Sequence, residues 1–243
     1  MNIYSNSPIY YSHFIWGAEH LPLNLSLIKF NGISTMTQMS YQHFDSIVTD
    51  IISDIFFIFS KKTYEIKHSS HSDIKNYIIV GYIGDYRFKL KNENIIKIKQ
   101  KFSELNVSKV ISYFDENSSD EEKFISGTDR YIRIHTNILN KVINDPTIAI
   151  IFKPKRIKNF YKHLKKIQLL FEQALKTDRV IVLGSENNSM PPANVLSISD
   201  YAIHSNFSSA TAGIESILSK TPTMFLNDHS LKEGKMYEYG KNE

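Results

Sequence analysis

Hydrophobic and polar positions from residue 107 onward alternate between two kinds of segment. Short apolar runs rich in β-branched residues, such as IAIIF and RVIVLG, are separated by longer amphipathic stretches. This alternation is typical of βαβ units, and runs that are apolar on both faces indicate a parallel sheet covered by helices on both sides. We predict strands over residues 109–114, 147–152, 179–183, 201–204 and 223–226. We predict helices over residues 129–143, 157–176, 193–198 and 209–219.

Residues 1–106 show a weaker pattern. Two apolar segments, 53–59 and 77–80, have the composition of strands, and KKTYEIKHSSHSD between them reads as a polar connector or a short helix. We therefore predict an α/β protein with a partial N-terminal domain over residues 1–106 and a doubly wound, Rossmann-like domain over residues 107–243. The short first part and the early stop after the last strand predict a fragment or a shortened form of a two-domain protein.

Composition narrows the classes of function. A hydrophobic content of 42% and a charged content of 22% are those of a folded globular protein. Lys and Arg total 29 against 25 Asp and Glu, scattered along the chain, so the charge suits a small anionic ligand and argues against nucleic acid. There is no Cys, which excludes thiolate nucleophiles and Cys-based zinc sites. No secretory signal or apolar run of ~18 residues is present, so we expect a cytoplasmic protein.

The candidate chemistry follows from the position of the strand ends. Ligands of open parallel sheets bind beyond the carboxyl ends of the strands, where helix N-termini present unpaired N–H groups. The polar residues expected there are Asp115, Glu116, Asn117, Lys153, Lys155, Arg156, Gly184, Ser185, Glu186 and the segment 205–209.

The segment HSNFSSATAGIES is the most informative of these. Small hydroxylic residues at a strand-to-helix turn can cap the helix and let its N–H groups meet a phosphate, so Ser208, Ser209 and Thr211 are candidates to contact a diphosphate. Glu215 lies farther along the same predicted helix and could accept hydrogen bonds from a ribose diol. The alternative is that the serines only cap a helix and that Glu215 is a surface charge.

The run FKPKR places cations directly after a buried strand. Lys153 and Lys155 could neutralise the charge of a leaving diphosphate, or they could begin a solvated basic helix. His204 ends a predicted strand and could bond a base or a phosphate, or it could be a structural histidine. Only His68 and His71 are closely spaced among the nine histidines, without zinc-site neighbours, so we expect no metal. No G-x-G-x-x-G, P-loop or G-x-S-x-G motif is present.

A family resemblance rests on three segments. HSNFSSATAGIESILSKTPTMFLN resembles the C-terminal donor-binding motif of GT-B glycosyltransferases. Upstream, GISTMTQMSYQHFDS followed by DIFFIF, and then YIIVGYIGDYRF, resemble the domain junction of bacterial transferases that build capsule or lipopolysaccharide. The resemblance implies two Rossmann-like domains that face each other, with transfer of a sugar or polyol phosphate from a nucleotide-activated donor to a surface-polysaccharide acceptor, and no cofactor or bound metal.

The resemblance also distributes roles among residues. On the donor it puts Ser205, Ser208, Ser209, Thr211 and Glu215, and to these we add Lys153, Lys155 and His204. On the cleft and acceptor side it puts Gln38, Ser40, Tyr41, Gly81 and Tyr82, and we add Asp115 and Asn117. Candidates for the catalytic base are His13, His43 and Asp45.

Two other functions stay open. A nucleotide-sugar 2-epimerase of the same fold would need carboxylates in the sugar pocket, for which Asp115 and Glu116 are the suppliers. A non-catalytic remnant that binds a nucleotide or a partner would fit the shortened chain. The expected partners are a nucleotide-sugar donor and a carbohydrate or lipid-linked acceptor. A lipid-linked acceptor would fit peripheral association with the inner face of the membrane, although we identify no basic amphipathic helix that supports it.

Overall fold

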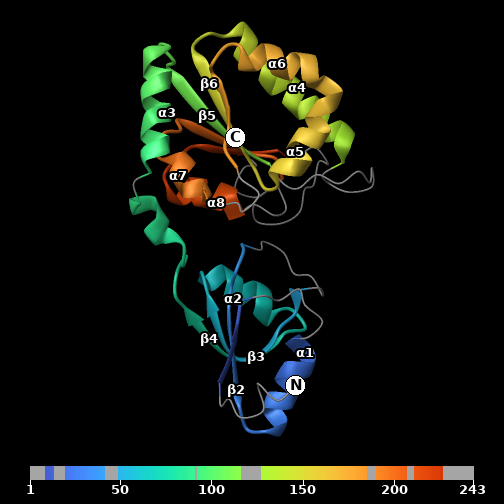
Figure 1. Cartoon of the computed structure of the whole chain (residues 1–243). Coiled ribbons are helices and arrows are strands. Elements are labelled where there is room, and N and C mark those ends of the chain that lie inside the picture. The colour runs from blue at the N-terminus through green and yellow to red at the C-terminus, as the bar shows by residue number, and fades with distance from the viewer. Residues whose placement is uncertain are drawn as a thin grey trace. The chain divides into compact units, whose positions relative to one another are not determined.

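The computed structural model describes residues 9–13, 20–41, 49–90, 92–115, 127–184, 190–206 and 211–226. The chain divides into two compact units, the first ending at Asp85 and the second beginning at Tyr86. This boundary falls earlier than the predicted one after residue 106, because the helix over 93–104 belongs to the second unit. Figure 1 shows both units.

The first unit contains a four-stranded parallel sheet in the order β1-β2-β3-β4. Its core is made by Met36 and Phe56, which are register partners on neighbouring strands, with Ile51 and Ile58. Tyr64 and Tyr77 pack against this core with their rings edge to face. The elements are β1 (Ile9–Ser12), α1 (His20–Lys29), β2 (Ile33–Thr37), β3 (Ile52–Ile58), α2 (Lys61–His68) and β4 (Asp73–Ile79).

The second unit contains a five-stranded parallel sheet in the order β7-β6-β5-β8-β9. The chain moves outward from β5 to β7, then returns to the other side of β5 for β8 and β9, which is a doubly wound topology with its switch point between β5 and β8. The strands are β5 (Lys109–Asp115), β6 (Ile148–Pro154), β7 (Val180–Val182), β8 (Tyr201–His204) and β9 (Thr223–Phe225).

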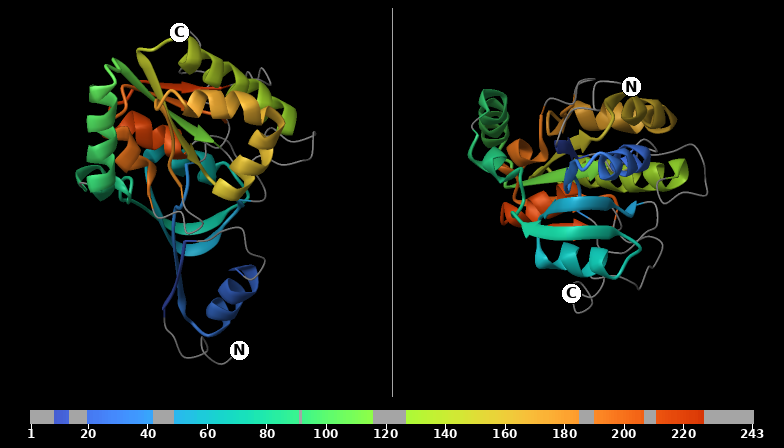
Figure 2. Two further views of the ribbon diagram at one scale, coloured as in Figure 1. Left: turned by 45° about the horizontal axis from the view of Figure 1, so that its top comes forward. Right: turned by 90° about the horizontal axis from the view of Figure 1, so that it is seen from below.

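Helices cover both faces of this second sheet, as Figures 1 and 2 show. The described helices are α3 (Glu93–Glu104), α4 (Thr128–Asn144), α5 (Ile157–Leu164), α6 (Gln168–Leu175), α7 (Pro192–Leu196) and α8 (Thr211–Leu218). The 3₁₀ segments η2 (Asp85–Lys89) and η3 (Lys165–Ile167) complete the elements. Helices α4, α5 and α6 pack on one face, and α3, α7 and α8 pack on the other.

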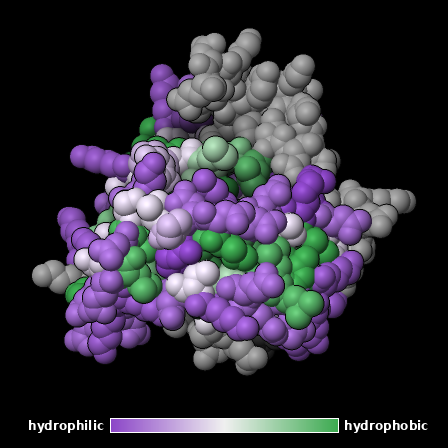
Figure 3. Space-filling model, turned by 90° about the horizontal axis from the view of Figure 1, so that it is seen from above, coloured by the Kyte–Doolittle hydropathy of each residue, from purple (hydrophilic) through white to green (hydrophobic). Residues whose placement is uncertain are grey.

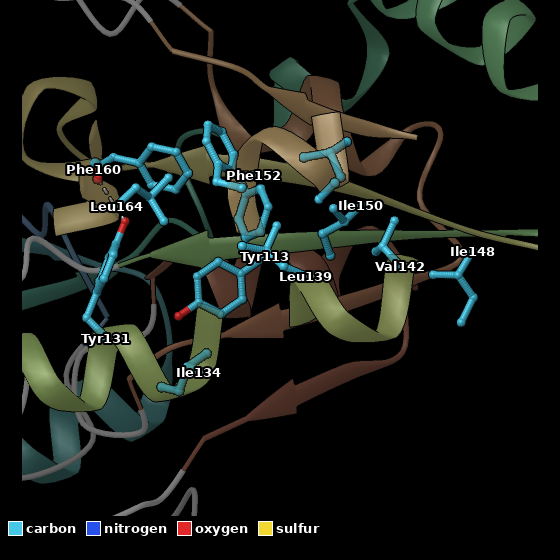
Figure 4. Packing of buried hydrophobic residues seen from close by; sticks show 13 residues of the cluster. Tyr113, Tyr131, Ile134, Leu139, Val142, Ile148, Ile150, Phe152, Phe160 and Leu164 are labelled. Atoms are coloured by element: carbon cyan, nitrogen blue, oxygen red, sulfur yellow. Dashed lines mark hydrogen bonds between the residues drawn. The ribbon is translucent and has the colours of Figure 1, made fainter. Parts of the chain in front are cut away.

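The alternation of side chains along β6 explains why its sequence is apolar throughout. Ile150 and Phe152 point into the cluster beneath α4, α5 and α6, where Tyr113 and Leu139 join them (Figure 4). Ala149 and Ile151 point to the other face, against α3 and α7. All seven residues of β6 are buried, so this strand holds the two layers of helices to the sheet.

The five strands predicted from residue 107 onward are confirmed, with ends shifted by one or two residues. The predicted helix over 157–176 is instead two helices, α5 and α6, separated by the tight turn η3. Of the two interpretations of KKTYEIKHSSHSD, the helix is confirmed: α2 begins after Ser60, whose hydroxyl caps the Thr63 N–H. Helix α3 and the elements β1 and α1 were not predicted.

The surface mixes polar and apolar side chains. In the face shown in Figure 3, hydrophilic side chains surround a band of hydrophobic ones. Such exposed apolar surface is common in folded proteins, because polar groups cannot cover a whole domain. No helix among the described residues is both long and apolar enough to cross a membrane.

Candidate functional site

The candidate site lies in the second unit, at the carboxyl edge of its sheet. Phe114 of β5 is the register partner of both Lys153 in β6 and His204 in β8. The Ser205 N–H donates to the Phe114 carbonyl oxygen at 2.9 Å. The ends of β5, β6 and β8 are therefore level, and the residues that follow them meet at the switch point, where open parallel sheets bind their ligands.

Three buried charged residues meet at this edge. Asp115 ends β5, Lys153 lies near the end of β6 and Glu215 comes from α8, and they are 8%, 5% and 3% exposed. Burial lowers the pKa of the Lys153 ammonium, and the negative charges of Asp115 and Glu215 oppose that shift. A buried cation between two carboxylates is stable only with such compensation, so these three residues form one electrostatic unit.

Glu215 reaches this edge because α8 packs closely on the sheet. A side chain at Gly213 would place its Cβ 2.3 Å from a ring carbon of Phe225 and 3.3 Å from Cβ of His204. The missing Cβ lets the helix backbone approach β8 and β9. Glu215, on the same helix, is 3% exposed, so the alternative that Glu215 is a surface charge is wrong.

His204 is bound within its own loop. The ring is 1% exposed, and its Nδ1 lies 2.7 Å from the Asn206 carbonyl oxygen and 3.1 Å from the Asn206 nitrogen. Phe225 packs beside the ring, with centroids 6.0 Å apart. These contacts favour the structural interpretation of His204, which shapes the turn after β8, over direct contact with a base or phosphate.

Arg130 is a cation at this edge that was not predicted from the sequence. It lies in the first turn of α4, half-buried, and its guanidinium donates to the Ser205 carbonyl oxygen. Burial raises the pKa of the phenol of the next residue, Tyr131, and the negative charge of Asp115 adds to that rise. The sequence predicts a helix that begins at residue 129, and helix N-termini in doubly wound sheets face the ligand edge. This position could have indicated Arg130.

Two of the remaining donor-side candidates lie among the described residues. Thr211 is the half-buried first residue of α8, whereas Lys155 is exposed beyond the end of β6. Asn117, Ser208 and Ser209 lie outside the described residues.

The cleft-side candidates belong to the first unit, where Gln38 has a clear structural task. Its side-chain amide donates to the Ser40 carbonyl oxygen at 3.0 Å, and its Oε1 accepts from the Phe59 N–H at 2.8 Å. Gln38 is 5% exposed, and its bond from Phe59 ties the end of β2 to the end of β3, whereas its bond to Ser40 stays within the segment after β2. Tyr41 is half-buried in the loop that follows.

The other first-unit candidates occupy strand ends. Gly81 adopts the left-handed backbone conformation, with φ of 77°, directly after β4. Tyr82 packs edge to face on Phe59, with ring centroids 5.3 Å apart. His13 is exposed just after β1. His43 and Asp45 lie outside the described residues.

Metal-ligating side chains do not gather in the parts of the chain that can be described. Across residues 9–13, 20–41, 49–90, 92–115, 127–184, 190–206 and 211–226, no three His, Asp or Glu side chains come together as a metal site would require. At the sheet edge, the two carboxylates of Asp115 and Glu215 act electrostatically on the Lys153 ammonium.

Comparison with known proteins identifies the fold. No protein-family model and no curated protein matches the chain. A glycosyltransferase from Rickettsia africae superposes with a TM-score of 0.54 at 13% identity, covering 90% of this chain and 57% of that one. Anabaena HepE in complex with UDP gives 0.50 at 12% identity, covering 88% and 58%. HepE in complex with UDP-glucose gives 0.50 at 11% identity, covering 90% and 59%.

The present chain spans less than two thirds of the length of each of these proteins. At such identities the likeness concerns the fold. The chain has their GT-B-like α/β fold, with parallel sheets and a Rossmann-like second unit, as the sequence predicted.

Proposed function

We propose that the chain binds a nucleotide-activated donor at the carboxyl edge of its second sheet and transfers the sugar, or the polyol phosphate, that this donor carries to a surface-polysaccharide acceptor. One observation carries the proposal: Asp115, Lys153 and Glu215 are buried together at the switch point of a doubly wound sheet. Burying charge is costly, and such clusters occur preferentially at functional sites. The likeness to a Rickettsia glycosyltransferase, and to HepE in its complexes with UDP and UDP-glucose, supports a nucleotide-sugar donor.

Each residue of the site has a chemical role in this proposal. The N-terminal turn of α8, beginning at Thr211, offers N–H groups to the diphosphate, and Lys153 supplies a positive charge. Glu215 accepts hydrogen bonds from the ribose diol. Arg130 fixes the loop after β8 through the Ser205 carbonyl, so that this loop meets the nucleotide in one conformation.

Transfer itself follows from these contacts. A hydroxyl oxygen of the acceptor attacks the anomeric carbon as the bond from that carbon to the diphosphate oxygen breaks. The leaving diphosphate gains negative charge, which Lys153 and the N–H groups stabilise. The proton of the attacking hydroxyl passes to a base, for which His13, His43 and Asp45 of the first unit are the candidates. The acceptor is a carbohydrate or a lipid-linked saccharide.

The donor site is tested by the thermal stability of the chain with UDP, UDP-glucose, CDP, GDP and TDP. A ligand at about 100 times its Kd adds about 2.7 kcal/mol of stability, which raises Tm by roughly 5–10 °C for a chain of this size. We expect selective stabilisation by the uridine nucleotides. Replacing Glu215 by Gln keeps its shape and removes its charge, and should weaken nucleotide binding by roughly 10–100-fold.

The matched control is Glu172→Gln, which removes an exposed carboxylate from α6. Equal loss of nucleotide binding in both variants, or no stabilisation of wild type by any nucleotide, would contradict the donor site. Release of UDP only when an acceptor is added identifies transfer. Interconversion of free nucleotide sugars would identify an epimerase instead, and binding without turnover a remnant.

A further inference from the structure

The positive charge of the chain is concentrated in one surface segment. Six of the 29 Lys and Arg residues lie within residues 155–166, and no Asp or Glu occurs between Asp145 and Glu172. The rest of the chain then holds 23 cations against 25 anions, a net charge of −2. The expectation of scattered charge is therefore wrong for α5 and its flanks.

Helix α5 presents this charge on one side. Lys158, Tyr161 and Lys162 are exposed on this helix, and Lys165 is exposed in η3. The last three residues follow Lys158 by three, four and seven positions. These spacings fall on one face of a helix. The opposite face, with Phe160 and Leu164, is buried in the core beneath α4 and α6 (Figure 4). Helix α5 is thus a basic amphipathic helix of the kind not recognised in the sequence.

Apolar side chains stand among these cations. Tyr161 is 45% exposed within the lysine stripe, and Leu169, one residue after the start of α6, is 77% exposed. Lys155, Arg156 and Lys166 are exposed on the flanks. Lysines beside exposed aromatic and aliphatic side chains suit the boundary between lipid headgroups and acyl chains, where the cation meets phosphate and the apolar group enters the bilayer.

We infer that the exposed side of α5, η3 and the start of α6 binds a membrane surface that carries anionic lipids. We call these residues the α5 face: Lys158, Tyr161, Lys162, Lys165, Lys166 and Leu169. A nucleic acid would also be attracted by the positive charge, but nucleic-acid binding would not explain why the apolar side chain of Leu169 is exposed. The inference goes beyond the proposed sugar transfer and uses none of the donor-site residues.

The test is co-sedimentation of the whole chain with vesicles of phosphatidylcholine alone or with one third phosphatidylglycerol. We expect binding to the anionic vesicles only. The triple variant Lys158→Gln, Lys162→Gln, Lys165→Gln should bind them on the order of a hundredfold more weakly, because each cation near an anionic surface contributes several-fold. The pair Tyr161→Ser and Leu169→Ser should also weaken binding, and this loss should persist in high salt.

The matched control removes the same charge elsewhere. Lys97, Lys99 and Lys109 are exposed on α3 and at the start of β5, and their triple replacement by Gln should leave vesicle binding within about threefold of wild type. Equal loss in both triple variants would overturn the inference, since net charge alone would then explain binding. Binding of wild type to polyuridylate but not to anionic vesicles would overturn it in favour of nucleic acid. Nucleotide affinity of the α5 variant should equal that of wild type, which separates this test from the donor site.

Discussion

Histidine 135 gives the second unit a built-in sensitivity to acid. The His135 ring is fully buried in α4, stacked on Tyr131 at a centroid distance of 3.8 Å and on Phe152 at 5.3 Å. Its Nδ1 lies 2.7 Å from the Tyr131 carbonyl oxygen, so this nitrogen carries the proton and donates. Nε2 is buried and has no hydrogen-bond partner among the residues that the structure describes. Protonation would therefore bury a charge among aromatic rings.

The magnitude follows from the pKa. Burial lowers the pKa of His135 from 6.5 to about 4. The hydrogen bond to the Tyr131 carbonyl opposes this shift, and the charge of His163 adds to it. A histidine whose pKa is lower in the folded state binds fewer protons there, so stability is complete above about pH 6.5 and falls as pH drops toward 4. The whole shift corresponds to about 3 kcal/mol, of which about 2 kcal/mol is lost at about pH 5.

Urea unfolding of wild type and His135→Phe from about pH 8 to about pH 4.5 measures this term. The variant keeps a ring in the cluster but cannot titrate, so its free energy of unfolding should fall by about 2 kcal/mol less than that of wild type between neutral pH and about pH 5. His71→Gln is the control, because the His71 side chain is 87% exposed. Parallel pH profiles for wild type and His135→Phe would refute the reasoning.

Four further substitutions test the packing. Gly213→Ala should lower the free energy of unfolding by about 1–3 kcal/mol, because the new Cβ meets the Phe225 ring, and an unchanged urea midpoint would contradict the close approach of α8. Gln38→Leu should cost about 1–3 kcal/mol in the same assay, since it removes the bond from Phe59 that joins β2 to β3 and the bond to Ser40, and a neutral effect would mean those bonds are replaced by water. Leu139→Ala at a fully buried position should cost about 2–5 kcal/mol, whereas Leu169→Ala on the surface should change Tm little, and equal effects would disprove the assigned burial.

Much of the second unit could be predicted because its signals are local. Strand β6 is apolar along its whole length since both of its faces are covered, and that run is visible in the sequence. Helix α3 was missed because isoleucine and lysine alternate over residues 96–99, a period of two that is typical of a strand. Ile95 and Phe102 are buried there, and Asn92 caps the helix by accepting from the Asn94 and Ile95 N–H groups. Together these features would have indicated the helix.

The candidate site could be predicted from the sequence only in part. The strand ends placed Asp115 and Lys153 at one edge correctly, because parallel strands share their carboxyl edge. The burial of Glu215 could not be predicted, since it depends on how α8 packs against the rest of the second unit. Arg130 was passed over for a similar reason: its partner is the Ser205 carbonyl, 75 residues away in the sequence.

Photoaffinity labelling with azido-UDP-glucose, followed by peptide mapping, tests the central claim most directly. The account predicts that unlabelled UDP abolishes the labelling. The adducts should map to peptides of the second unit that contain the ends of β5, β6 and β8 or the start of α8, and Glu215→Gln should reduce them while Glu172→Gln does not. Adducts that UDP does not displace, or that spread over the surface of both units, would contradict a donor site at this edge.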